Sequence, residues 1–185
     1  MSRADRFDRA DFQSRYEPQP PKDAAVPAAA SAGSTPSAAT PIPIWPVAAP
    51  RIGQSVLTDR NGKGRPHKGV DLFVPGGSPV RAVRSGKVLR VIDGRNSADA
   101  SKARAGLFID IRSNDGLIYR YLHLGSASVT ANQTVRAGTR IGAVAPEGTS
   151  GTGSSSHLHL EVRKGDWNGD TYGDPIDPLT ILKKK

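Results

Sequence analysis

Alternating polar and apolar residues between His157 and Val162 constrain the fold more than any other stretch of the chain. Side chains two residues apart on a β-strand point to the same face of its sheet. One face of this strand is therefore apolar and can enter a core, because it carries Leu158, Leu160 and Val162. The opposite face presents two imidazoles and a carboxylate side by side, from His157, His159 and Glu161.

The first histidine of the chain lies in an equally distinctive segment. His67 precedes Asp71 by four residues, with Gly69 between them. Pro66 comes immediately before this histidine. Proline and glycine favour a bend that leads into a strand, so this one segment could supply a nitrogen and an oxygen ligand together.

The remaining histidine, His123, falls on a predicted hairpin. Its strands, 107–112 and 117–124, flank the turn signal Asn114-Asp115-Gly116. Alternation along the second strand places His123 on one face with Tyr119 and Tyr121. The other face of that strand is expected to carry Ile118, Leu122 and Leu124.

Short strands and turns are predicted for most of the chain. Glycine and proline are frequent, at 20 and 15 residues, whereas aromatic residues make up only 5%. No helix of convincing length is predicted, and residues 93–105 are expected to form a polar loop. The predicted fold class is all-β: a compact antiparallel sheet with long loops, preceded by a disordered tail.

A change in composition near residue 51 predicts the domain boundary. Residues 17–50 hold nine of the 15 prolines and many alanines. Such a segment cannot bury a core and is typical of an extended linker. We expect residues 1–50 to be a flexible tail and linker and residues 51–185 to be the folded domain. The chain is expected to contact that domain first through Ile42, Ile44, Trp45 and Val47.

The charge of the chain suggests an anionic partner. The net charge is +9, and residues 51–185 hold the whole excess, with 21 basic and 12 acidic side chains. A basic domain attracts an anionic cell-wall surface or nucleic acid, although the charge could also serve only solubility. We predict no nucleic-acid partner, because aromatic stacking platforms are not apparent. No apolar run of 18 residues exists, so no membrane span is expected.

Any metal in this chain must be held by nitrogen and oxygen, because there is no cysteine. Zn²⁺ in hydrolytic sites takes three protein ligands and leaves a fourth position open. These ligands could be His67, Asp71 and His159. His123 and His157 could then contact an attacking water or the developing oxyanion, since histidine transfers protons near neutral pH.

Each of these residues also has a simpler interpretation. A lone His123 is more typical of a core or surface histidine, and Asp71 could cap a turn. The histidines of 157–162 could belong to a solvated polar face. The zinc hypothesis depends on their joint occurrence, because all four histidines fall in compact motifs.

The pattern His67-x-x-x-Asp71, followed far downstream by His157-x-His159, resembles the lysostaphin/LytM-type zinc endopeptidases of bacterial cell walls. Further blocks in that family's order, including Tyr121-Leu-His-Leu124, extend the resemblance over residues 51–182. The resemblance implies that zinc is bound by His67, Asp71 and His159. It also implies that His123 and His157 are the catalytic histidines, beside a groove that receives peptidoglycan peptides.

The resemblance therefore predicts a monomeric zinc endopeptidase that acts at the cell wall, in the periplasm or outside the cell. The first thirty residues lack a signal-peptide pattern, which leaves a phage-encoded protein, specialised secretion or a trimmed form open. The main alternative is a non-enzymatic module that binds the wall or regulates hydrolases. Residues 59–66 lack the aromatic residue, often tyrosine, that many family members carry there, so its role falls to Arg60, to Arg65 or to no residue.

Overall fold

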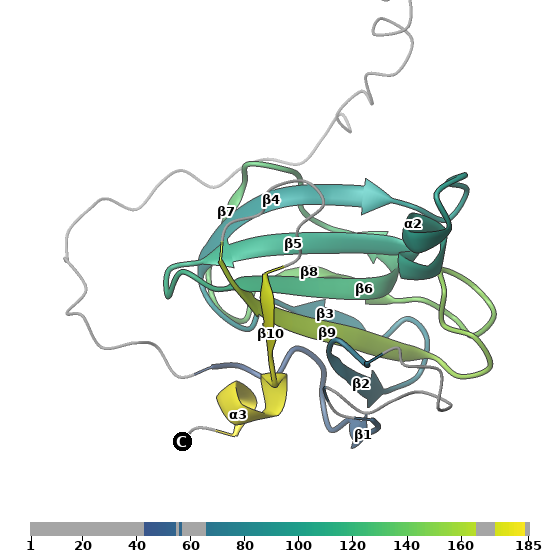
Figure 1. Ribbon diagram of the computed structural model, residues 1–185, viewed down its shortest axis with the longest axis horizontal. Helices are drawn as coiled ribbons and strands as arrows, with labels where there is room; N and C mark the ends of the chain where they lie inside the picture. Colours follow the sequence, from purple (N-terminus) through teal and green to yellow (C-terminus); the bar gives the residue numbers. More distant parts are fainter. Residues whose placement is uncertain (1–42, 55, 57–65, 166–172, 184–185) are drawn as a thin grey trace, which may run out of the picture. The chain divides into compact units, whose positions relative to one another are not determined.

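The computed structural model describes residues 43–54, 56, 66–165 and 173–183. Within these ranges ten strands form one sheet, accompanied by two short helices (Figure 1). The strands are β1 (Arg51–Ile52), β2 (Val70–Phe73), β3 (Pro79–Arg81), β4 (Gly86–Asp93), β5 (Leu107–Ser113), β6 (Ile118–Ala127), β7 (Thr134–Val135), β8 (Arg140–Val144), β9 (His157–Lys164) and β10 (Asp174–Ile176). The helices are α2 (Ala100–Ala105) and α3 (Pro178–Leu182).

All the strand pairs of this sheet are antiparallel, as the predicted fold class requires. The main path through the sheet is β1-β2-β9-β6-β5-β4-β7, and β8 joins β3 to β6. β9 therefore lies between β2 and β6, two strands that come from distant parts of the sequence (Figure 1). This placement brings the segment around residue 71 and the segment around residue 123 beside β9.

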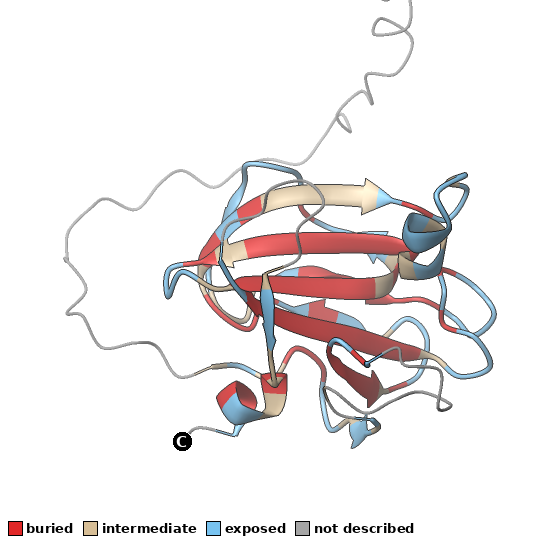
Figure 2. Ribbon diagram, viewed as in Figure 1, coloured by how far each residue is buried: buried red, intermediate tan, exposed pale blue. Residues whose placement is uncertain are grey.

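The alternation along β9 has the predicted consequence. Leu158, Leu160 and Val162 are fully buried in the hydrophobic core. The intervening polar side chains line a groove on the other face of the sheet, from His157, His159 and Glu161. Figure 2 shows β9, β6 and β5 as the most continuously buried strands. The local period of two residues thus fixes both the core contribution of β9 and its polar face.

The predicted faces of β6 are wrong at their C-terminal end. Tyr119, Tyr121 and Leu124 all belong to the core, whereas Leu122 and His123 line the groove. The register of β6 against β5 shifts by one residue in this region, and His123 has a φ of 61°. A bulge inserts one extra residue and re-aims a side chain. It moves His123 from the face of the tyrosines to the face of the groove.

The bulge lies where β6 changes its second partner. From Ile118 to Leu122 the strand pairs with β9, and from Leu124 to Ala127 it pairs with β8. A regular strand would have kept His123 on the core side. The bulge therefore satisfies both the core and the groove, since Leu124 returns to the core and the imidazole of His123 reaches the groove.

The predicted polar loop 93–105 is also corrected, because its second half forms helix α2. The side chain of Asp99 accepts hydrogen bonds from the backbone N–H groups of Ser101 and Lys102, which is N-terminal capping. The helix ends at Gly106, whose N–H donates to the carbonyl of Lys102. Six residues are too short a helix for an apolar period to reveal it in the sequence.

The segment before β1 packs on the sheet. The N–H of Ile44 donates to the carbonyl of Val83 over 3.0 Å, and the carbonyl of Pro46 accepts from Arg81 over 2.8 Å. Val47 is only 2% exposed and belongs to the core, and Trp45 is partly buried against it. Ile42, also expected to make this contact, lies outside the described residues.

None of the described helices is both long enough and apolar enough to cross a membrane.

The hydroxyl of Tyr121 gives a direct test of the core. It accepts a hydrogen bond of 2.9 Å from the N–H of Val83, and the whole side chain is buried. Tyr121→Phe would leave that buried N–H without its acceptor, so we expect a loss of about 1–3 kcal/mol in the free energy of unfolding. Chemical denaturation measures it. Ser126→Ala, at the exposed end of the same strand, is the control and should change stability by less than about 0.5 kcal/mol.

Candidate metal centre

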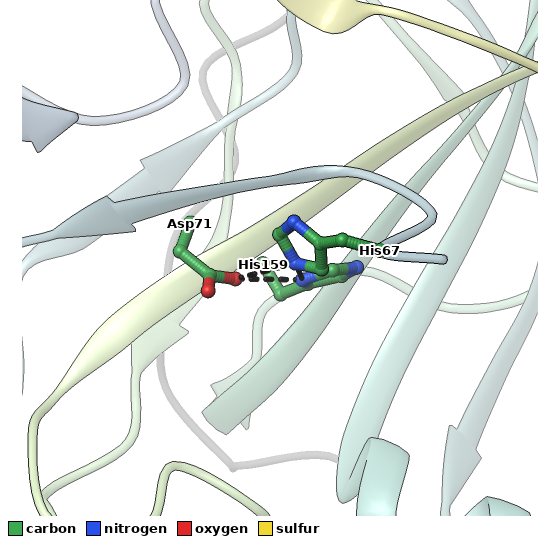
Figure 3. A group of neighbouring side chains, drawn as sticks. All are labelled: His67, Asp71 and His159. Carbon is green, nitrogen blue, oxygen red and sulfur yellow. Dashed lines mark hydrogen bonds and ion pairs between the residues drawn. The ribbon is translucent and has the colours of Figure 1, made fainter. Parts of the chain in front are cut away.

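Three buried side chains from separate places on the sheet converge on one point. His67 lies in the bend before β2, Asp71 lies on β2, and His159 lies on the neighbouring strand β9 (Figure 3). Nδ1 of His159 is 2.8 Å from Oδ1 of Asp71. Nε2 of His67 is 3.2 Å from that oxygen and 3.1 Å from Nδ1 of His159. All three residues are at most 7% exposed.

The register of two strands explains why the carboxylate and one imidazole meet. Asp71 on β2 is the direct cross-strand partner of His159 on β9. Directly opposed residues of antiparallel strands have Cβ atoms about 4.5–5.5 Å apart, so their side chains touch. A methyl group at Gly69 would lie 2.2 Å from the carbonyl oxygen of Leu160. Glycine at that position lets the bend that carries His67 approach β9 closely.

The geometry of the three atoms fits a divalent metal. Tetrahedral Zn²⁺ with bonds near 2.0–2.1 Å holds its ligand atoms about 3.3 Å apart. The observed separations of 2.8, 3.1 and 3.2 Å therefore need only small adjustments. Two imidazole nitrogens and a carboxylate oxygen are also ligands that zinc accepts. These residues satisfy the distance and the chemistry of a three-ligand site.

The electrostatics favour a charged carboxylate at this point. Burial opposes ionisation of Asp71, but hydrogen bonds from His159 and His67 outweigh it and hold the pKa well below its usual range. Burial likewise disfavours a charge on His159, but Asp71 and Glu161 together raise its pKa. The cluster thus favours a positive charge next to the ionised oxygen of Asp71. A bound cation would supply such a charge, as a protonated imidazole does.

A second carboxylate supports the cluster from behind. Oε1 of Glu161 is 3.3 Å from Nε2 of His159, the ring nitrogen that faces away from Asp71. A carboxylate on the outer nitrogen fixes the tautomer and orientation of a metal-binding histidine. Despite its burial, His159 and Arg163 lower the pKa of Glu161 to about 2. Sequence reasoning placed Glu161 on the correct face but gave it no role, although its spacing from His159 was the available signal.

The other two histidines lie beside the cluster. The ring centroids of His123 and His157 are 4.8 Å apart, and His123 is 5.8 Å from His159. Nδ1 of His157 lies 2.8 Å from the carbonyl of Ser155, and Nδ1 of His123 lies 3.0 Å from that of Ser150. A carbonyl oxygen can only accept, so each Nδ1 must donate. In the neutral rings both Nε2 atoms are consequently left as proton acceptors.

His123 is held in the neutral form. Its burial, together with the nearby charges of His159 and His157, lowers its pKa to about 3. The imidazole is therefore unprotonated at neutral pH, with a lone pair on Nε2.

Ser150 is a supporting residue that sequence reasoning missed. Its hydroxyl donates to the carbonyl of Leu124 over 2.7 Å and accepts from the N–H of Leu107 over 2.8 Å. These bonds fix the loop before β9 to β5 and β6, and so fix the carbonyl that orients His123. No pattern in the sequence marks it, because the contact joins segments 26 and 43 residues apart.

The cluster opens onto a groove with two arms. The first arm, of about 490 Å³, reaches from His159 and His123 to helix α2. The second, of about 660 Å³, reaches from Asp71 to Arg51 and Phe73 near β1. Both arms include His157. An extended peptide could therefore lie across the three-ligand cluster. The tyrosine substitutes suggested above, Arg60 and Arg65, lie outside the described residues.

An antiparallel sheet that carries a buried His–Asp–His cluster beside an open groove is the arrangement of a metallopeptidase catalytic domain. The model of a known family, peptidase family M23, matches residues 65–178. The chain belongs to this family, whose members are zinc metallopeptidases. The resemblance to lysostaphin/LytM-type enzymes is thereby confirmed, as is zinc as the expected metal.

Individual proteins agree with the family match. The chain is 32% identical over 111 residues to the glycyl-glycine endopeptidase ALE-1 of Staphylococcus capitis, covering 60% of this chain and 28% of that protein. It is 34% identical over 117 residues to the DD-carboxypeptidase/endopeptidase Mpg of Neisseria meningitidis, covering 63% of this chain and 23% of that protein. The chain thus spans less than a third of the length of these relatives.

A solved structure confirms the fold. The crystallised catalytic domain of the antimicrobial peptidase lysostaphin from Staphylococcus simulans aligns with a TM-score of 0.59 and 28% identity. The alignment covers 73% of this chain and 93% of that domain. The described sheet is therefore the sheet of a lysostaphin-type catalytic domain, as the predicted fold class states.

The contact between Glu161 and His159 predicts a measurable effect on metal affinity. Glu161→Gln keeps the shape of the side chain but removes the charge that faces Nε2 of His159. We expect Zn²⁺ affinity to fall by about 10–100-fold, the usual effect of losing an outer hydrogen-bond partner. Competition with a chelating indicator measures it. Glu147→Gln, in the exposed loop before β9, is the matched control. Equal affinities for both variants would show that Glu161 does not support the metal.

Proposed function

We propose that this domain is a zinc-dependent endopeptidase that hydrolyses peptide bonds in bacterial peptidoglycan, within stem peptides or cross-bridges. The observation that carries the proposal is the convergence of His67, Asp71 and His159, of which Asp71 and His159 line the groove. The relatives support the substrate, because one is named for glycyl-glycine bonds and another as a DD-carboxypeptidase/endopeptidase.

In this proposal His67, Asp71 and His159 hold the zinc ion. Bound zinc supplies a Lewis acid that polarises an amide carbonyl and lowers the pKa of water. Asp71 contributes the one negative charge among the three ligands, and its low pKa keeps that charge in place. Glu161 holds the ring of His159 so that Nδ1 points into the cluster.

His123 and His157 are the proposed catalytic histidines. Their Nδ1 atoms donate to backbone carbonyls, so Nε2 is the atom of each ring that can exchange a proton with the reactants. One Nε2 would take the proton of the attacking water, and a protonated imidazole would stabilise the developing oxyanion. The two rings lie in contact, so the proton-accepting and oxyanion-stabilising groups stand next to each other.

The proposal also covers the organisation and location of the protein. The catalytic domain would comprise residues 51–185 together with the segment 43–50 that packs on its sheet, and the preceding residues would tether it. The domain would work as a monomer at the cell wall, in the periplasm or outside the cell. The excess of basic residues in 51–185 supports attraction to an anionic wall surface.

Digestion of purified peptidoglycan tests the function. We expect the zinc-loaded protein to release muropeptides, and a strong chelator to stop the release until zinc is restored, because the metal activates the scissile amide. His159→Ala should bind zinc poorly and release none. Mass spectrometry of the soluble products measures the outcome and identifies the bond. Cleavage that persists in the chelator, or in His159→Ala, would defeat the proposal.

Two further variants separate the proposed roles. His123→Ala and His157→Ala should keep stoichiometric zinc while losing at least about 100-fold in activity, since general acid–base catalysis typically contributes that much. Metal analysis, carried out together with the digestion assay, distinguishes these two variants from His159→Ala, which should bind zinc poorly. Loss of zinc in either variant would contradict the assignment.

A further inference from the structure

The two arms of the groove differ in charge. The first arm, which we call the basic arm, is lined by four cationic side chains, Lys68, Arg104, Arg120 and Arg163, and by one carboxylate, Glu161. The second arm has one cation and one carboxylate, Arg51 and Asp71. There the guanidinium of Arg51 stacks on the ring of Phe73 at 4.2 Å. A peptide lying across the cluster therefore meets a positive field on one side only.

The two arginines at the floor of the basic arm are held by ion pairs. Arg120 bonds both oxygens of Asp110, at 2.8 and 3.0 Å, and Arg90 contacts the same carboxylate at 2.5 Å. Arg163 pairs with Glu161 at 2.5 Å. The network thus joins three guanidinium groups to two carboxylates, and this pairing holds Arg120 and Arg163 in place at the floor of the arm.

The rim of the basic arm adds two exposed cations from separate segments. Lys68 comes from the bend beside His67, and Arg104 comes from α2. A methyl group at Gly151 would lie 2.0 Å from the carbonyl oxygen of Arg104, so the end of α2 is pressed against the loop before β9. Within the described part of the chain, no hydrogen bond or ion pair involves the guanidinium of Arg104. The backbone of α2 thus positions a cation that the surrounding residues do not neutralise.

We infer that the basic arm receives a carboxylate of the substrate, and that Arg104 determines this specificity. The inference rests on the proposed peptidase function and adds the substrate class: an acidic peptide rather than an uncharged oligoglycine. A concave site of one charge concentrates the opposite charge, and a guanidinium binds a carboxylate through two parallel hydrogen bonds. The carboxylate can be a side chain or the C-terminus of the peptide, because both present the same group.

Selective amidation of one substrate provides the test. A soluble muropeptide that the zinc-loaded protein cleaves is prepared in three further forms, with its side-chain carboxylates, its C-terminus, or both converted to carboxamides. We expect one of the single amidations to lower kcat/KM by about tenfold, the scale of a lost charge-assisted hydrogen bond. The form that loses activity identifies which carboxylate the basic arm receives. Equal kcat/KM for all four forms overturns the inference and leaves the peptidase function intact.

Variants assign the effect to the basic arm. Arg104→Gln should lower kcat/KM by about tenfold on the acidic peptide and by less than about twofold on the fully amidated one. Lys68→Gln should act in the same direction, and Arg104→Lys should restore part of the loss. Arg136→Gln removes an exposed cation outside both arms and should leave both substrates unchanged. Equal losses for Arg104→Gln on acidic and amidated peptides also overturn the inference.

Equilibrium binding separates this inference from the proposed function. If the zinc-loaded protein cleaves none of the four peptides, the peptidase proposal fails, and calorimetry on the acidic and fully amidated forms then tests the basic arm alone. Tighter binding of the acidic form that is lost in Arg104→Gln supports a carboxylate site. Equal binding of the two forms, or a preference that survives Arg104→Gln, rejects it.

Discussion

Contact between one buried carboxylate oxygen and two histidine nitrogens is the interaction on which the rest of the site depends. Oδ1 of Asp71 lies 2.8 Å from His159 and 3.2 Å from His67, in a residue that is only 5% exposed. A carboxylate buried this deeply requires a positive partner. The partner on β9 is supplied by strand register, and a slip of one residue would turn Asp71 toward the core. The pairing of β2 with β9 therefore also sets the geometry of the candidate metal site.

A buried ionic network links this cluster to the wall of the groove. Glu161 contacts His159 on one side and Arg163 on the other, and Arg120 continues the network to Asp110. Buried ion pairs add little net stability but hold their members in fixed positions. The network therefore orients the ring of His159 and holds two guanidinium groups, Arg120 and Arg163, against the groove.

The bulge in β6 resolves a conflict between core and site. The core needs Tyr121 and Leu124, and both are fully buried. A regular strand would place His123 on the same face as Tyr121, where an imidazole could not reach the groove. The positive φ of His123 and the shift in register turn that side chain around, and Ser150 fixes its ring. Such backbone irregularities often occur next to functional sites.

The sequence alone determined the features that depend on a local period or on residue chemistry. The two faces of β9, the antiparallel fold class and the nitrogen–oxygen donor set follow from alternation, turn residues and the lack of cysteine. Tertiary structure decided the features that depend on strand pairing. The face of His123 follows from the change of partner along β6, and the roles of Glu161 and Ser150 follow from contacts that only the folded sheet creates. A period of two residues predicts which side chains of a regular strand are buried and which are exposed. It cannot predict where pairing with distant strands makes that strand irregular.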